Sequence, residues 1–422
     1  MRCGGTLLLS MLLLAGPAPA AADEVVIRVF GDKTAHNAIA PGIQAFNERF
    51  KGKYRAEVET IAQTTAVLDR EVAQFIAGTA TYDVVSLNNY WVPEVARYLE
   101  PLGPALRRAG IDPVSTFGPG VMRDVTYRDS VVALPYRLNL DVLFYRKDVL
   151  DEAGLRIPAT LDEYLAAARK LTRKSGGTTV YGTGIKTPEP LWTVIAFAGH
   201  FMLPNGGRLI TADRKHAHPS LKSALAVKVL QLLRTLTQEG LTPNPLSLTF
   251  QDNVVLFQQG RMAMNGENFT RAVQLEDPLK SKAAGKMAYA PMPSQKLGPD
   301  PPVYYGSAWT YAIDKNSKVK DAAWEYIRFI TSPEIQKLNA AKTGNGATSP
   351  SVYDDPAVVR ANPAARAVRA ALETGYTHPF PVPQLTQLQQ IVHEEVQQVI
   401  LGRKSPEAGA AAMFERVDRA LQ

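Results

Sequence analysis

Three carboxylates in predicted loops could carry acid–base chemistry. Asp32, Asp141 and Glu267 are of the residue type that a secreted glycosidase uses in pairs, one as general acid and the other as base or nucleophile. No spacing in the sequence pairs two of them, and each is more typical of a solvated, capping or ligand-contacting group. Catalysis by paired carboxylates is therefore an alternative, and the sequence favours binding without reaction.

The histidines and the cysteine form no motif for a metal or a nucleophile. His216 and His218 resemble half of a metal site, but two further ligands at useful spacing are missing. His393 begins a pattern like that of a zinc-protease helix, yet Gln397 stands where the second histidine is required. The only cysteine is Cys3, and no nucleophile elbow or glycine-rich phosphate loop is present. We expect no metal, no cofactor and no enzyme activity.

The N-terminal third alternates between strand and helix patterns. Strand-like runs at 25–30, 56–60 and 82–87 are separated by apolar residues at helical spacing, at 39–50 and at 68–76. This order predicts a parallel sheet with right-handed crossovers, in which ligands lie at the carboxyl ends of the strands. The loops after Phe30 and Leu87 are therefore the first candidates for a site.

The rest of the chain predicts further strands and long helices. Apolar strands are expected at 131–136 and 142–145, on either side of a polar link at 137–141. Thr160 and Glu163 form a capping box at the start of a helix. The apolar run 303–313 is expected to cross between two lobes, and 383–401 is expected to form an amphipathic helix that Gly402 ends.

The first 22 residues are typical of a cleaved secretory signal. Arg2 precedes an apolar run at 7–14, and small residues follow up to Ala22. The run is shorter than the roughly 20 residues that a membrane-spanning helix needs. We expect cleavage near Ala20 to Ala22 and export to the periplasm. A lipid anchor is not expected, because Cys3 lies ahead of the apolar run.

The charge pattern indicates a solvated surface. The formal net charge is +7, and without Arg2 there remain 46 basic and 40 acidic residues. Basic residues are scattered singly and in pairs, with no basic block or tail. We expect no nucleic-acid partner, and we expect a monomer.

Blocks along most of the chain resemble the family 1 extracellular solute-binding proteins, which serve ABC importers for maltose, trehalose, other sugars and polyols. The longest block is ALPYRLNLDVLFYRKD at 133–148, which continues at 152–154 and 158–164. A second block includes GSAW at 306–309, AI at 312–313, NSK at 316–318, AAW at 322–324 and FITSPE at 329–334. Shorter blocks lie at 82–85 and 257–264, so the resemblance covers nearly the whole chain after residue 22 in the expected order.

The resemblance implies an α/β fold like that of type II periplasmic binding proteins, with two α/β lobes joined by crossing hinge strands and a ligand cleft between them. Lobe 1 would hold 23–138 plus 309–350, and lobe 2 would hold 139–308 plus 351–422. Two tryptophans, Trp91 and Trp324, are expected in the core. The positions that correspond to ligand contacts are Asp32, Lys33, His36, Asn88, Tyr90, Tyr136, Asn139, Trp192, Asn268, Tyr305, Gly306 and Trp309.

Two of these positions depart from the pattern of sugar-binding members, which often carry aspartate where Asn88 and Asn139 stand. An amide binds a hydroxyl group without the strength of a charge-assisted hydrogen bond. The implied function is the extracytoplasmic substrate-binding component of an ABC importer for a carbohydrate or polyol, which closes about its hinge and delivers the ligand to the permease. Because Lys33 and Arg137 are expected near the cleft, one alternative is an anionic or non-sugar solute, such as a sugar acid or glycerol phosphate. Arg137 could equally point to solvent, since neighbours on a strand face opposite sides. Another is a secreted carbohydrate-active enzyme.

Overall fold

Three parallel strands begin the central sheet. The computed structural model describes residues 23–422, apart from residues 63 and 176. In it β1 (Val25–Asp32) lies between β2 (Tyr54–Ile61) and β3 (Val84–Asn88) and runs parallel to both. The connections are α1 (Lys33–Ala38), α2 (Ala40–Arg49) and α3 (Thr64–Ala77). The predicted parallel sheet is confirmed, and the carboxyl ends of β1 and β3 lie at the same edge.

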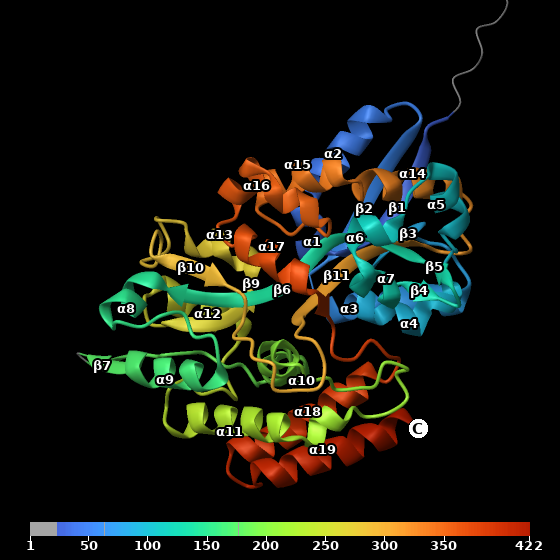
Figure 1. Cartoon of the computed structure of the whole chain (residues 1–422). Coiled ribbons are helices and arrows are strands. Elements are labelled where there is room, and N and C mark those ends of the chain that lie inside the picture. Colours follow the sequence, from blue (N-terminus) through green and yellow to red (C-terminus); the bar gives the residue numbers. More distant parts are fainter. Residues whose placement is uncertain (1–22, 63, 176) are drawn as a thin grey trace, which may run out of the picture.

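Two long antiparallel strands carry this sheet from one α/β lobe into the other (Figure 1). The first part of β6 (Ala133–Arg146) pairs with β11 (Tyr304–Ile313), and β11 pairs in turn with β3. The second part of β6 pairs with β9 (Met264–Asn268) and β10 (Met287–Ala290), while the start of β11 pairs with β12 (Tyr376–Thr377). These two strands join the lobes.

One sequence prediction about β6 is wrong. The polar link expected at 137–141 is not a break, because its backbone stays in the sheet. Arg137 and Asn139 pair with β11, and Asp141 pairs with β9. The polar side chains of this stretch find partners of their own, so their polarity does not interrupt the strand.

Helices cover the sheet within each lobe (Figure 1). In the first lobe, α2 packs with α14 (Lys320–Ile330) and α15 (Pro333–Thr343) through rings such as Phe46 against Tyr326. In the second lobe, α10 (Pro190–Val194) and α11 (Ala224–Gln238) pack on α18 (Leu385–Ile400), which also contacts α19 (Pro406–Leu421). The remaining α-helices and β-strands of the described residues are α4 (Val92–Val95), α5 (Gly103–Ala109), α6 (Pro113–Phe117), α7 (Pro119–Asp124), β4 (Thr126–Tyr127), β5 (Ser130–Val131), α8 (Lys147–Glu152), α9 (Leu161–Leu171), β7 (Arg173–Ser175), β8 (Thr178–Val180), α12 (Phe250–Gln258), α13 (Ala272–Leu275), α16 (Pro356–Ala361) and α17 (Ala365–Thr374).

Several local predictions can be checked directly. The capping box of α9 is confirmed, since the Glu163 amide donates to the Thr160 hydroxyl at 3.1 Å and the Glu163 carboxylate accepts from the Thr160 amide. Trp91 and Trp324 are buried, as expected. Ile76 was expected in the apolar stripe of α3, but it is 72% exposed.

The predicted signal, residues 1–22, lies outside the described residues. Over the part of the chain that the structure describes, no helix is long and apolar enough to cross a membrane.

Candidate ligand-binding site between the lobes

The loop after β1 forms the first part of the site. Asp32 ends the strand and caps α1, because its Oδ1 accepts a hydrogen bond from the Ala35 amide at 2.8 Å. Lys33 follows and is exposed. His36 turns the other way, into the lobe, with Nδ1 bonded to the Asp32 carbonyl oxygen at 2.9 Å. Burial lowers the pKa of His36 to about 4, so this ring is neutral at neutral pH.

Tyr136 lies in the core of the first lobe. Its ring stacks on Tyr311 with centroids 4.1 Å apart, and its hydroxyl is 2.7 Å from the Ser86 hydroxyl. His36 packs 6.1 Å from the same ring. The structure thus places Tyr136 and His36 together behind the loop after β1, and ligand contact by either of them stays a prediction.

The loop after β3 brings an aromatic cluster to the junction of the lobes. Asn88 ends β3 opposite Trp309 of β11. Tyr90 stacks on His378 with centroids 4.0 Å apart, and Tyr305 lies 5.9 Å from the same imidazole. Burial raises the pKa of Tyr90 and lowers that of His378 to about 3, so both rings are neutral at neutral pH. Residues from three distant parts of the sequence therefore meet here.

Two more predicted residues of β11 have clear packing roles. The Trp309 ring meets the Trp91 ring edge to face at 5.6 Å. Gly306 lies against Tyr376, and a β-carbon at position 306 would come within 2.6 Å of that ring. Glycine is therefore required here for close approach of β11 to the segment at 376–378.

Buried charges line the second-lobe side. The Lys186 ammonium lies 2.8 Å from a Glu267 carboxylate oxygen, and the His200 imidazole lies 3.0 Å from Asp141. All four side chains are buried. The Lys186 ammonium also lies 5.3 Å from the centre of the Trp192 ring. Each of these carboxylates is bound to a basic side chain, which suits a rigid binding surface better than a pair of catalytic acids.

Amide side chains complete the junction. Asn268 ends β9 opposite Asp141 and accepts a hydrogen bond from the Thr270 amide at 3.1 Å. Asn139 accepts from the Arg137 guanidinium at 2.8 Å and lies 3.5 Å from the Ser307 hydroxyl. The neighbourhood of β6 and β11 is thus rich in groups that bind hydroxyls and anions.

The structure brings most of the predicted residues to the crossing of β6 and β11, while Lys33 remains exposed and His36 and Tyr136 face the first-lobe core. The sequence prediction missed Lys186, His200 and His378 as members of this cluster. No local pattern could have found them. Lys186 meets Glu267 across 81 residues, and His378 lies in a proline-rich segment without a motif. Within residues 23–422 other than 63 and 176, no group of three or more His, Asp or Glu side chains is placed to hold a metal ion.

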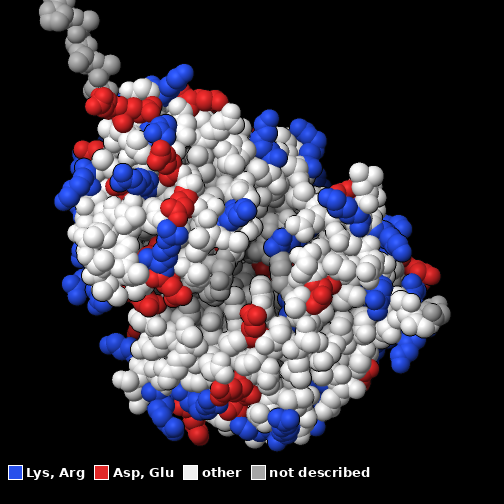
Figure 2. Space-filling model, turned by 180° about the vertical axis from the view of Figure 1, so that it is seen from behind, with Lys and Arg blue, Asp and Glu red and all other residues white. Residues whose placement is uncertain are grey.

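A cavity of about 670 Å³ adjoins this cluster at the junction of the lobes. Its walls include Arg123 of α7, Arg214 and His378, so it meets the aromatic cluster at the imidazole. None of the twelve predicted residues lines this cavity. Beside it, the Arg214 guanidinium binds the Asp124 carboxylate at 2.9 Å and links α7 to the second lobe. Seen from behind, the molecule is hollowed between its two lobes, with charged groups of both signs at the rim (Figure 2).

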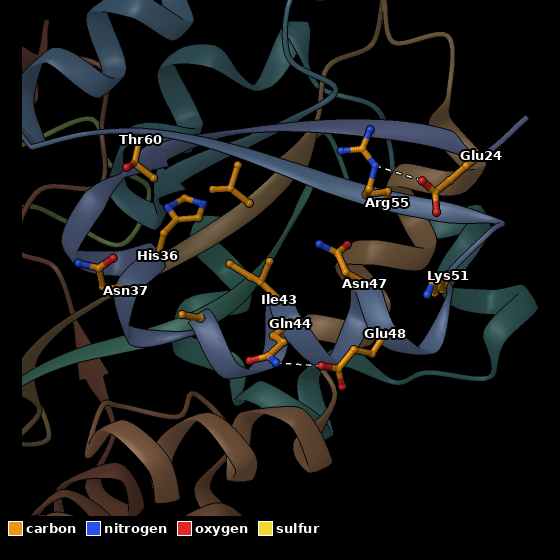
Figure 3. Close-up of a pocket in the computed structure, with 12 residues that line it drawn as sticks. Glu24, His36, Asn37, Ile43, Gln44, Asn47, Glu48, Lys51, Arg55 and Thr60 are labelled. Atoms are coloured by element: carbon orange, nitrogen blue, oxygen red, sulfur yellow. Dashed lines mark hydrogen bonds and ion pairs between the residues drawn. The ribbon is translucent and has the colours of Figure 1, made fainter.

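A second cavity, of about 730 Å³, lies wholly on the first lobe (Figure 3). It runs between α2 and the first two strands, and His36 is the only predicted residue in its wall. Its polar side chains bind one another, as Gln44 binds Glu48 and Arg55 binds Glu24. Movement of the second lobe cannot close this groove, so it is a weaker candidate than the junction.

Comparison with known proteins gives a consistent result. A probable amino-acid ABC transporter periplasmic-binding protein of Sinorhizobium fredii is 22% identical over 361 residues, which cover 82% of this chain and 78% of that protein. The mannitol-binding protein of Pseudomonas aeruginosa is 27% identical over 275 residues, 63% of this chain and 61% of the relative. Among solved structures, maltose-bound MalE3 of T. maritima superposes with a TM-score of 0.79 at 22% identity, over 94% of this chain and all of the other.

This likeness to MalE3 confirms the expected type II fold with two lobes. The model of one protein family, described as bacterial extracellular solute-binding protein, matches residues 34–337. That stretch contains both crossing strands, the loop after β3 and the buried charges of the second lobe. The chain belongs to the bacterial extracellular solute-binding protein family.

Proposed function

We propose that this protein is the substrate-binding component of an ABC importer and that it binds a carbohydrate or polyol between its lobes. The observation that carries this proposal is the crossing of β6 and β11, where aromatic rings and buried polar groups from both lobes meet. Aromatic faces cover the apolar side of a sugar ring, and short polar groups bind its hydroxyls. The mannitol-binding relative and maltose-bound MalE3 support this class of ligand, whereas the relative of Sinorhizobium fredii is named for amino acids.

The proposed mechanism is closure about the crossing strands. A ligand that contacts both lobes binds the closed form more tightly than the open form, and it therefore shifts the population towards closure. The closed form is then recognised by the membrane permease. We further propose that the lobes divide at 138/139, 308/309 and 350/351, that residues 1–22 are a cleaved signal and that the exported protein works in the periplasm as a monomer.

We also propose that the protein returns its ligand chemically unchanged. The pairing of Asp141 with His200 and of Glu267 with Lys186 supports this, because a glycosidase needs carboxyl groups available for proton transfer and attack. A secreted carbohydrate-active enzyme is thus the weaker alternative.

A thermal-shift screen of sugars, polyols and sugar acids tests the proposal. A ligand at 100 times its Kd adds about 2.7 kcal/mol to the free energy of unfolding, so a true ligand raises the melting temperature by several degrees. The ligand should be recovered unaltered after incubation, as NMR of the supernatant would show. Consumption of the stabilising compound would contradict the binding-protein assignment.

A further inference from the structure

Arg137 is a buried cation whose partners are all neutral. Arg137 lies on β6 and is only 6% exposed. Nη1 donates to the Asn139 amide oxygen at 2.8 Å, and Nη2 donates to the Asn345 amide oxygen at 3.3 Å. Nε has no hydrogen-bond partner among the described residues. The guanidinium is thus held in place by amides while its charge stays uncompensated.

The other buried cations among the described residues are paired with carboxylates. Lys186 binds Glu267, and Arg146, at the far end of β6, binds Asp148 through two hydrogen bonds of 2.8 and 2.6 Å. For Arg137, no carboxylate oxygen of the described residues lies within 4.0 Å. A buried charge is costly unless it is paired, so the exception calls for a partner that the chain itself does not supply.

Two charged groups of opposite sign act on Arg137. Asp32 and Arg271 both act on the Arg137 guanidinium, one from the first lobe and one from the segment after β9. Desolvation lowers the pKa of Arg137 to about 10, so the group remains a cation at neutral pH. Lys186 and Glu267 neutralise each other, and the opposite charges of Asp32 and Arg271 offset one another, so no carboxylate is left to pair directly with the Arg137 guanidinium.

We propose that the ligand is a polyhydroxylated anion, a sugar or polyol that carries a carboxylate or phosphate group, and that Arg137 holds the anionic group. This inference rests on the proposed function and names the chemistry of its ligand. The planar guanidinium presents parallel N–H groups that fit a carboxylate or phosphate. The ligand oxygens replace the weaker amide acceptor of Asn139, and the anionic group pairs with the charge of Arg137.

Matched pairs of compounds test the inference. The probes are sorbitol with gluconate, glucose with glucuronate and with glucose 6-phosphate, and glycerol with glycerol 3-phosphate. In at least one pair the anion should raise the melting temperature of the wild-type protein while its neutral counterpart does not. The acid and phosphate arms show which anionic group fits. If only neutral compounds bind, this inference is overturned and the proposed function stands. If no compound binds, both are overturned.

Variants of β6 give a readout that does not depend on the ligand found. Arg137→Gln removes an unpaired buried charge and should raise the melting temperature of the ligand-free protein, while weakening anion binding at least tenfold. Arg146→Gln is the matched control, because it breaks a carboxylate pair away from the site: it should lower the melting temperature and leave ligand affinity unchanged. A melting temperature lowered by Arg137→Gln, or unchanged anion affinity, would overturn the inference.

Asn139→Asp tests the same point without removing the arginine. A carboxylate at position 139 would pair with Arg137 inside the protein. We expect a higher melting temperature without ligand and at least tenfold weaker anion binding, measured by calorimetric titration. Undiminished anion binding in this variant would show that Arg137 does not hold the ligand.

Discussion

At the scale of single residues, the sequence indicated where ligand-binding groups lie along the chain but not where their side chains point. Asp32 and Asn88 could be nominated because they end strands of a parallel sheet. The inward turn of His36 could not, since it depends on the packing of α1 against Tyr136 and Tyr311. The Lys186–Glu267 pair could not be predicted either, because tertiary structure alone joins residues so far apart.

The buried imidazole of His36 gives a prediction for the dependence of stability on pH. Its pKa is about 4 in the folded protein and near the ordinary 6.5 when unfolded. The unfolded chain therefore binds the proton more tightly, and stability present above pH 6.5 is lost as the pH falls towards 4. Between pH 7 and pH 4, the free energy of unfolding of the wild type should fall by about 3 kcal/mol more than that of His36→Asn. Urea denaturation at each pH measures this difference.

The control for this prediction is His216→Asn. His216 is exposed on the second lobe, where its side chain is 56% accessible. This variant should follow the pH profile of the wild type. If His36→Asn follows that profile as well, the His36 ring is accessible to protons in the folded protein.

At the scale of secondary-structure elements, strands and helices were predicted well where one periodicity runs without interruption. β1 and α18 are examples, because their apolar residues follow a strand run and a helical stripe. The stretch 137–141 was misread because its polar side chains suggested a loop. Backbone pairing on both sides keeps it in β6, and a pattern of side-chain polarity does not report such pairing.

The close approach of β11 to the segment at 376–378 depends on Gly306. Gly306→Ala places a methyl group against the Tyr376 ring and should lower the free energy of unfolding by about 1–3 kcal/mol. The cost should largely disappear when Tyr376→Ala is the background, because the ring that the methyl group meets is then absent. Urea denaturation of the four proteins in this double-mutant cycle measures the coupling.

Gly103→Ala is the matched control for the added methyl group. The only side chain near a β-carbon at that position is the far end of Arg107, at 3.4 Å. The control should be neutral or slightly stabilising, because alanine restricts the unfolded chain. Equal costs of Gly306→Ala with and without the Tyr376 ring would contradict the proposed packing.

At the scale of the whole molecule, the order of sequence blocks predicted two lobes, and the likeness to MalE3 confirms the two-lobed fold. The contacts that link the lobes were not predictable, because they join loops distant in sequence. Tyr90 stacks on His378, and Asp124 of α7 binds Arg214. Burial raises the pKa of Asp124 to about 6 even beside this arginine. In the proposed closure, such contacts would help to set the balance between open and closed forms, on which a ligand acts only through its difference in affinity for the two.

Small-angle X-ray scattering with and without ligand tests the central claim most directly. The sample is the chain without residues 1–22, at saturation with the compound that stabilises it most in the thermal-shift screens. Closure of two lobes around a solute predicts a smaller radius of gyration in the complex than in the ligand-free protein. An unchanged radius of gyration at saturation would contradict the account of a receptor that closes on its ligand.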